Sequence, residues 1–369
     1  MGQLFLFYKM EEKRNIKSYT YSDLEDILVD AGFPKFRAEQ LFREIYLSNR
    51  SNFDEVSMIN KELRQFLKDN FEYDAFKDVK KQVSVDGSVK FLFKLHDGNR
   101  IESVYMPWQN DDEDKPERTT ICVSSQVGCG LDCKFCATGT LGLTRNLSTE
   151  EIVDQVLVAE RYLEHPITNI VFMGMGEPLL NFNSVIRSIE ILSDKELTKI
   201  RRKKITVSTS GVIPRIPKLT QLDPPVKLAL SLHATTNGVR DKIVPLNEKS
   251  NISELMNKIE NYYRETKLPI TYEYIPFDGL NDTIEDAKRL AKIAKRVPSR
   301  VNIIPFNDIS FTNPTGISAE LKASPSERIS EFANEIRMFG GTVTVRDTFG
   351  KDIDAACGQL ALSNRDENV

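Results

Sequence analysis

The feature that most constrains the fold is an alternation of short apolar segments with amphipathic helical segments, which begins near Thr119 and runs toward the C-terminus. Six apolar segments of strand length follow that point, at 170–173, 205–208, 228–232, 271–275, 301–304 and 343–345. Helical stretches separate them, and this order predicts a parallel α/β core. Six or seven such units favour an open or complete barrel over a flat doubly wound sheet. In barrels the site lies at the carboxyl ends of the strands.

Helix start signals in the sequence support this alternation of strands and helices. Capping boxes are expected at Ser148/Glu151 and at Ser324/Glu327, and the second has Pro325 at the first helical position.

The segment that precedes the core is predicted to be helical over 22–73, with a capping box at Ser22/Glu25 and a second helix over 37–46. A turn at 31–34 supplies Gly and Pro where a helical hairpin needs them. Plain helical packing and RNA contact both fit this hairpin. The basic side chains concerned are Lys35, Arg37 and Arg43.

Between the helical segment and the core, the stretches 89–93 and 100–105 read as short antiparallel strands. We therefore expect an N-terminal helical accessory domain at 1–80, a β extension at 81–117 and the barrel core at 118–369, which includes a C-terminal cysteine loop.

The charge balance argues against non-specific coating of nucleic acid, because 54 acidic residues face 50 basic ones and the net charge is −4. Part of the acidic excess lies in the loop 111–114, which looks like a solvated insertion. RNA binding would need a local basic face. The best basic run is 201–204, with Lys80 and Lys81 as a second group, and a solvated turn is the alternative for either.

The first eight residues contain too short an apolar run for a signal peptide, and no stretch of about 18 uncharged apolar residues occurs. We expect a cytoplasmic protein that makes no membrane contact.

Three of the five cysteines form a C-x3-C-x2-C run, Cys129, Cys133 and Cys136, directly after the first core strand. Five cysteines so unevenly placed do not suit a disulfide framework, so ligation or redox chemistry is the better interpretation. Three thiolates on one loop can ligate three irons of a cubane cluster and leave the fourth iron open. A structural zinc site is the alternative, but zinc normally takes four ligands, and the nearest histidine in the sequence is His165.

This spacing resembles that of radical S-adenosylmethionine (SAM) enzymes. The stretch from Glu102 to Gln359 resembles, more narrowly, the RlmN family of ribosomal and transfer RNA adenine-C2 methyltransferases, and the N-terminal module resembles that family's accessory domain. The matching segments are Cys122-Val123-Ser124-Ser125-Gln126-Val127-Gly128-Cys129, Gly174-Met175-Gly176-Glu177-Pro178-Leu179-Leu180-Asn181, Ser208-Thr209-Ser210-Gly211, Ser231-Leu232-His233-Ala234 and Ala355-Ala356-Cys357-Gly358-Gln359.

The resemblance implies a partial (βα)6 TIM-like barrel that holds a [4Fe-4S] cluster on the three clustered cysteines and uses two molecules of SAM per turnover. It implies that SAM is bound by Gly176, Glu177, Ser208, Ser231, Leu232, His233 and Asn307. Glycines allow a close approach of the backbone, and a carboxylate can accept from the ammonium of the cofactor. The alternatives are an ordinary turn in which Glu177 pairs with a surface lysine, and plain cap or turn roles for the Ser and Asn residues.

The resemblance also implies catalytic roles for Glu102, Cys122 and Cys357. Adenine C2 has no lone pair to attack a sulfonium methyl, so a direct displacement fails. In the family the cysteine matching Cys357 is methylated first, its carbon becomes a radical that adds to C2, and the cysteine matching Cys122 then resolves the adduct through a disulfide. Glu102 matches the position described as a proton acceptor, and a thiolate is the other candidate for that role. Plain packing is the alternative for each cysteine.

The expected partners are 23S ribosomal RNA at the peptidyl transferase centre, transfer RNA at the adenosine next to the anticodon, and a flavodoxin or ferredoxin electron donor. We expect a monomer. Three other functions stay open: a C8-specific adenine methyltransferase of the same superfamily, an oxidoreductase that uses the cluster for electron transfer alone, and a zinc-stabilised RNA-binding module without catalysis.

Overall fold

The computed structural model describes residues 13–108, 118–195 and 200–361. The first eight residues, the acidic loop 111–114 and the polar tail after Ala361 lie outside these ranges. The helices are α1 (Tyr21–Asp30), α2 (Phe36–Tyr46), α3 (Lys61–Asn70), α4 (Ala137–Thr140), α5 (Thr149–Leu163), α6 (Phe182–Leu192), α7 (Asn237–Ile243), α8 (Ile252–Thr266), α9 (Ile284–Ala294), α10 (Ile317–Glu320) and α11 (Ser326–Met338).

The strands are β1 (Arg14–Asn15), β2 (Phe71–Glu72), β3 (Phe76–Val83), β4 (Val89–Leu95), β5 (Arg100–Trp108), β6 (Arg118–Cys122), β7 (Gln126–Gly128), β8 (Leu143–Asn146), β9 (Asn169–Phe172), β10 (Ile205–Thr209), β11 (Lys227–Ser231), β12 (Ile270–Tyr274), β13 (Ser299–Ile303) and β14 (Val343–Val345). Short 3₁₀ turns are η1 (Ile16–Ser18), η2 (Phe53–Glu55), η3 (Arg202–Lys204), η4 (Ile216–Gln221), η5 (Pro245–Lys249), η6 (Ser310–Thr312) and η7 (Lys351–Ile353).

One ten-stranded sheet carries the core, in the order β14-β13-β12-β11-β10-β9-β6-β5-β4-β3. Strands β6 and β9 to β14 pair in parallel, and helices lie between them along the chain. The six predicted strands match β9 to β14 within one or two residues, so the predicted parallel core is confirmed. Since β14 and β3 end the row without pairing to each other, the barrel is partial.

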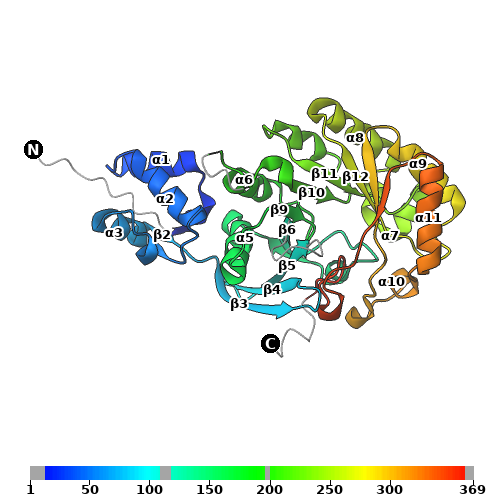
Figure 1. The fold of residues 1–369 in the computed structure, drawn as a ribbon, viewed down its shortest axis with the longest axis horizontal. Helices are drawn as coiled ribbons and strands as arrows, with labels where there is room; N and C mark the ends of the chain where they lie inside the picture. The colour runs from blue at the N-terminus through cyan, green and yellow to red at the C-terminus, as the bar shows by residue number, and fades with distance from the viewer. Residues whose placement is uncertain (1–12, 109–117, 196–199, 362–369) are drawn as a thin grey trace, which may run out of the picture.

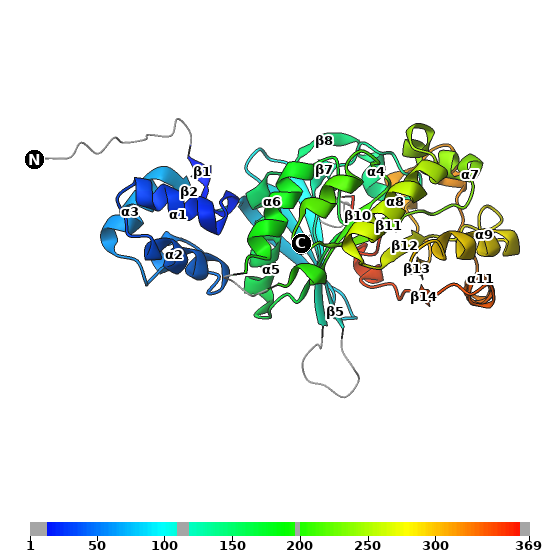
Figure 2. The same ribbon diagram turned by 90° about the horizontal axis from the view of Figure 1, so that it is seen from above.

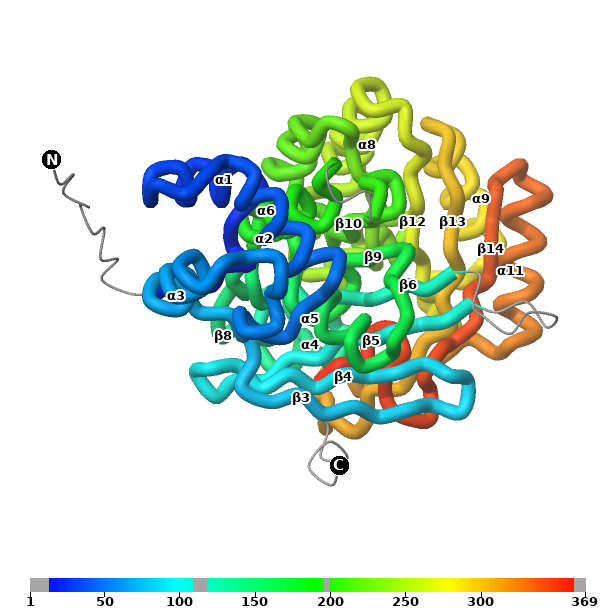
Figure 3. Tube along the Cα trace, turned by 60° about the vertical axis from the view of Figure 1, so that its left-hand side comes forward, coloured from blue at the N-terminus to red at the C-terminus, as the bar shows by residue number. Residues whose placement is uncertain are grey.

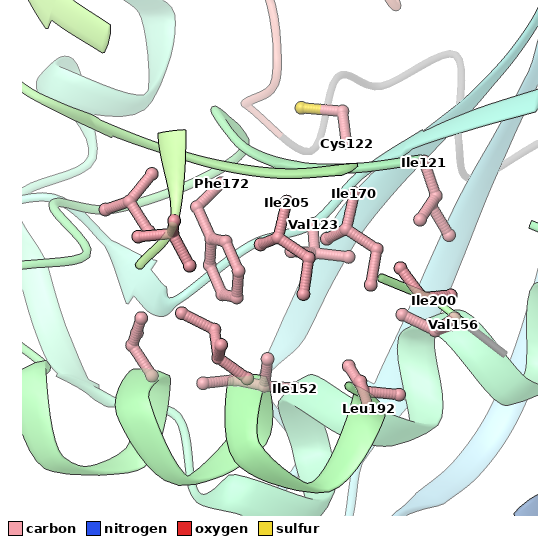
Figure 4. Close-up of a cluster of buried hydrophobic side chains, with 14 of the residues drawn as sticks. Ile121, Cys122, Val123, Ile152, Val156, Ile170, Phe172, Leu192, Ile200 and Ile205 are labelled. Carbon is pink, nitrogen blue, oxygen red and sulfur yellow. The ribbon is translucent and has the colours of Figure 1, made fainter. Parts of the chain in front are cut away.

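Apolar side chains on the outer face of the parallel strands pack against α5 and α6. Figure 4 shows Ile121 and Ile170 pointing toward Ile152 and Leu192 of these helices. In the same view the sulfur of Cys122 points away from this cluster, to the other face of the sheet. The alternation of side chains along a strand therefore separates helix packing from the barrel interior.

Helix α5 begins as the sequence predicts, with a capping box between Ser148 and Glu151. The predicted box at Ser324/Glu327 is wrong, because α11 has Pro325 as its N-cap and Ser324 donates to Asp282 instead, at 2.7 Å. The local sequence pattern assigned the Ser324 hydroxyl to the helix cap, but in the fold it donates to a carboxylate that is distant in the sequence.

The N-terminal module is a group of helices, α1 to α3, at one end of the molecule beside α5 and α6 (Figures 1 and 2). Helix α2 agrees with the predicted 37–46 helix within one residue. The capping box expected at Ser22/Glu25 is wrong, since the chain uses Thr20 and Asp23, two residues earlier.

A buried ion pair ties this module to the core. Lys17 of η1 binds Asp154 of α5 at 2.6 Å, with side-chain exposures of 0% and 2%. The Lys17 ammonium also lies 4.3 Å from the ring centre of Tyr73, and the amide of Ala75 donates to Asp154 at 3.1 Å. The fixed polar contacts set the position of the module on α5.

The predicted antiparallel segment is confirmed as β4 and β5, and β3 joins them as a third strand. These strands continue the barrel sheet through the β5–β6 pair. Strand β3 also runs across the boundary expected at residue 80, so the sheet is continuous where the sequence suggested a division. Among the described residues, no helix combines the length and the apolar character needed to cross a membrane.

Candidate active site

Three cysteines lie on the loop between β7 and α4. Cys129, Cys133 and Cys136 are free and partly buried. Burial raises the pKa of Cys129 to about 12, and the neighbouring Cys136 adds to this effect. Burial also raises the pKa of Cys133 and of Cys136. Thiols in this state become ligands when a metal displaces their protons.

The spacing of these sulfurs separates two kinds of metal site. Within the described residues, no three His, Cys, Asp or Glu side chains lie close enough together to hold a single metal ion. A cubane cluster needs no such convergence, because each thiolate binds a different iron. Three thiols on one loop are the donor set of a cluster with one open iron, whereas zinc normally takes four ligands.

Glu177 lies after β9, buried beside this loop with 3% exposure. Its carboxylate accepts from the amides of Leu179 at 3.1 Å and Ser210 at 2.9 Å. Burial raises the pKa of Glu177 to about 7, against these hydrogen bonds. The alternative of a turn carboxylate paired with a surface lysine is not what the structure shows.

Gly176 directly precedes Glu177, and the structural reason for a glycine there differs from the one that the sequence suggested. Its φ is +96°, and a Cβ there would lie 2.5 Å from the Cβ of Gln126. The close approach that requires glycine is therefore made by the protein's own chain. A ligand is not needed to explain it.

The predicted cofactor residues of the next strands do meet at one edge of the sheet. The hydroxyls of Ser208, at the end of β10, and Ser231, at the end of β11, lie 3.4 Å apart. Leu232 is fully buried, and His233 follows it with φ +54°. The Nδ1 atom of His233 accepts from the amide of Ile275 at 3.2 Å.

Burial, together with the nearby positive charge of Arg240, lowers the pKa of His233 to about 3. The imidazole is therefore neutral near pH 7, and its Nδ1 acts as an acceptor. The side chain of His233 therefore contributes an uncharged surface at this strand end, and its hydrogen bond to Ile275 holds the ring in place.

Arg240 of α7 is a residue that the sequence reasoning missed. Its side chain is fully buried and donates to the carbonyl oxygens of Leu232 at 3.0 Å, Ser231 at 3.1 Å and Ser210 at 2.6 Å. Its Nη1 atom donates to the side-chain oxygen of Asn247 at 2.9 Å. One guanidinium thus fixes two neighbouring strand ends. An arginine in an amphipathic helix gives no signal of this role, because solvent exposure is its usual state.

Cys122 and Cys357 line one pocket, although 235 positions separate them in the sequence. Cys122 comes from β6 and is buried, while Cys357 lies on the loop after β14 and is exposed. Val104, Met106 and Arg346 line the same pocket. Burial raises the pKa of Cys122 to about 12, and Cys357 adds to this effect.

Asn307 also lines the pocket, and its amide donates to the carbonyl oxygen of Cys357 at 3.0 Å. The structure therefore places this predicted cofactor residue, which follows β13, in contact with the loop that carries Cys357.

The cysteine loop is held from the opposite side by the turn between β3 and β4. Ser84 donates to Asp352 at 2.5 Å, and the amide of Gly350 donates to Asp86 at 2.7 Å. Figure 3 shows this C-terminal segment lying beside β4 and β5.

Glu102 lies two residues before Val104 on β5 and is 1% exposed. Its carboxylate forms an ion pair with Lys90 of β4 at 3.2 Å, and Ser124 donates to its backbone carbonyl. Glu102 is not among the residues that line the pocket of the two cysteines.

The basic residues expected at an RNA face take part in contacts within the chain. Lys35 pairs with Glu25 at 2.7 Å, Arg37 binds Gln40, and Arg202 donates to the carbonyl of Asp223 at 2.7 Å. These contacts do not test RNA binding, which stays a prediction for these residues.

Two family models match the chain. Residues 123–292 match the Radical SAM superfamily, and residues 14–72 match the ribosomal RNA large subunit methyltransferase N-terminal domain. The chain is 40% identical over 355 residues to a probable dual-specificity RNA methyltransferase RlmN from Cytophaga hutchinsonii, covering 95% of this chain and 93% of the relative. It is 41% identical over 352 residues to the dual-specificity RNA methyltransferase RlmN of Geotalea uraniireducens, with coverages of 95% and 97%.

Among solved structures, a radical SAM methyltransferase from Sphaerobacter thermophilus is similar over 94% of this chain and 99% of that one. The TM-score is 0.86 and the sequence identity is 39%. The similarity therefore covers the module, the β extension and the core together.

Proposed function

The chain belongs to the RlmN family of radical SAM RNA methyltransferases, and on that premise we propose that it methylates C2 of adenine in 23S ribosomal RNA and in transfer RNA. The observation that carries this proposal is the division of the five cysteines. Three lie on one loop, and the other two, Cys122 and Cys357, line a separate pocket. A cluster requires three thiolate ligands on one loop, and methyl transfer through a cysteine requires two further thiols in a pocket of their own.

In this proposal Cys129, Cys133 and Cys136 hold a [4Fe-4S] cluster. SAM binds at the strand ends formed by Gly176, Glu177, Ser208, Ser231, Leu232, His233 and Asn307. When bound, the cluster and SAM supply an electron, a methyl group and a 5′-deoxyadenosyl radical.

The thiolate of Cys357 accepts the methyl group by displacement at carbon. After loss of a hydrogen atom, the carbon on this sulfur bonds to adenine C2 and joins the enzyme to the RNA. The thiolate of Cys122 then attacks the Cys357 sulfur, so that a disulfide forms and the carbon–sulfur bond breaks. In the same stage the adduct must lose the C2 proton and one electron, which the cluster would take back when bound. The carbon that leaves sulfur keeps the bonding electron pair and gains a proton, which completes the methyl group. External thiols reduce the disulfide before the next cycle.

Two groups of this chain can take the C2 proton. Glu102 is held by Lys90 and lies two residues before Val104, which lines the pocket, whereas Cys122 lines the pocket itself. Methylation by a Glu102→Gln variant separates the two, because only the carboxylate route requires Glu102.

The target adenine must leave its stack to reach this pocket, which favours loops and single-stranded regions of RNA. We propose the peptidyl transferase centre of 23S ribosomal RNA and the adenosine next to the transfer RNA anticodon as the sites. A flavodoxin or ferredoxin supplies the electron, and the protein works as a monomer in the cytoplasm, where these RNAs and thiol reductants are present.

The test is nucleoside analysis of both RNAs after incubation with the anaerobically reconstituted protein, SAM and a reductant. We expect 2-methyladenosine, and peptide mass spectrometry should find a methyl group on Cys357. Formation of 8-methyladenosine would identify the C8-specific alternative. A Cys133→Ala variant that still methylates RNA would contradict the proposal.

A further inference from the structure

The guanidinium of Arg240 is a buried charge without an ion-pair partner. Its exposed fraction is 0%, and its four hydrogen bonds go to three backbone carbonyls and the Asn247 amide oxygen. Within the part of the chain that the structure describes, no carboxylate oxygen forms an ion pair with it. The carboxylate of the adjacent Asp241 binds the Asn247 side chain instead, at 2.6 Å.

A buried charge is costly unless an opposite charge is near. Burial lowers the pKa of Arg240 to about 10, which leaves the guanidinium protonated at neutral pH. The Asp241 carboxylate acts on this cation electrostatically, and a further negative charge in the neighbouring space would stabilise it more.

The loop of Cys129, Cys133 and Cys136, where a thiolate-bound cluster would carry negative charge, is linked to Arg240 through Ser210. The carbonyl of Ser210 accepts from Arg240 at 2.6 Å, and its hydroxyl lies 3.9 Å from the Cys133 sulfur. The Ser210 amide, in turn, donates to Glu177 at 2.9 Å.

A cluster ligated by thiolates is negative and becomes one unit more negative when it accepts an electron. A fixed cation nearby stabilises the reduced form more than the oxidised form. Because Arg240 is fully buried and held by four hydrogen bonds, solvent screens this interaction little.

We propose that Arg240 is a positioning residue for the electron-transfer step, whose fixed positive charge beside Cys133 raises the reduction potential of the cluster. This inference rests on the proposed function, since it requires the three cysteines to hold a cluster. In the step itself one electron passes from a low-potential reductant to the oxidised cluster, no proton moves, and Arg240 stays charged throughout.

The test is a redox titration of the full-length, anaerobically reconstituted protein, with the reduced cluster followed by electron paramagnetic resonance. Arg240→Gln should move the midpoint potential to a more negative value, whereas Arg240→Lys, which keeps the charge, should stay near the wild type. Arg296→Gln is the matched control, because Arg296 pairs with Glu260 on the surface, and its potential should not change.

An unchanged potential in Arg240→Gln, at wild-type iron content, would overturn the inference. So would an equal negative shift in Arg240→Lys, because geometry and not charge would then be responsible. If Arg240→Gln does not keep its cluster, Asn247→Asp sets a carboxylate against the same guanidinium without emptying the site. It should also give a negative shift, and an unchanged potential there would equally contradict the inference. A wild type that binds no iron would instead contradict the proposed function.

Discussion

The buried pair between Lys17 and Asp154 gives a prediction whose size follows from the structure. Lys17→Met keeps the aliphatic stem but removes the ammonium, and it leaves the Asp154 carboxylate buried without its partner. Removal of one member of a buried pair costs about 3–5 kcal/mol. Because every 1.4 kcal/mol is about tenfold in an equilibrium constant, local opening of the module should become roughly 10²- to 4 × 10³-fold more frequent.

Native-state amide hydrogen exchange measures that opening. Amides of α1 and α2 should exchange faster by this factor in Lys17→Met, while those of the core strands β10 to β12 change little. The matched control is Lys35→Met on the same module, because Lys35 is 72% exposed in its pair with Glu25 and solvent already screens that contact. Its exchange should equal the wild type.

A double variant tests whether charge is the cause. Lys17→Met with Asp154→Leu leaves no unpaired charge, and apolar replacement of a buried pair is often close to neutral. The amide of Ala75 loses its acceptor in this variant, which costs about 1–3 kcal/mol. We therefore expect stability between the single variant and the wild type. Exchange in Lys17→Met that matches the Lys35→Met control would refute the reasoning.

Three further predictions follow from the site. Cys122→Ala should accumulate a covalent protein–RNA adduct, visible as a band resistant to denaturant, because the thiol that releases Cys357 is absent; free methylated RNA at the wild-type rate would count against this. Since the pKa of His233 is lowered to about 3, the unfolded chain binds a proton below pH 6.5 that the folded chain does not, and stability should fall by up to about 1.4 kcal/mol per pH unit as pH decreases. His233→Gln should flatten that part of the stability curve, and an unaltered slope in urea unfolding would contradict the assignment. Asp352→Ala, which removes the acceptor of Ser84, should speed amide exchange in the Cys357 loop and lower kcat for methylation, and an unchanged kcat would show that the β3–β4 turn does not position this loop.

Much of the site was predictable because it is local in sequence. Cys129, Cys133 and Cys136 lie within eight residues, so their spacing alone indicated three ligands for a cluster. Residues that follow parallel strands, such as Ser208 and Ser231, were expected to meet because the carboxyl ends of such strands share one edge. The structure places their hydroxyls 3.4 Å apart.

Other features depend on contacts that no local pattern contains. Ser324 has the sequence context of a helix cap, yet Asp282 takes its hydroxyl. Gly176 was expected to make room for a ligand, and it makes room for Gln126. In both cases a residue that is distant in the sequence makes the contact in the folded state, in place of the partner that the local pattern suggested.

The sequence by itself determined the parallel α/β core and the cluster loop, because periodicity and ligand spacing act over a few residues. Only the tertiary structure decided that Cys122 and Cys357 line one pocket, that Lys17 is buried against Asp154, and that Arg240 is buried and linked through Ser210 to Cys133. The physical reason is that burial and charge pairing depend on which segments the folded sheet brings together. A charged side chain looks the same in the sequence whether it faces water or the interior.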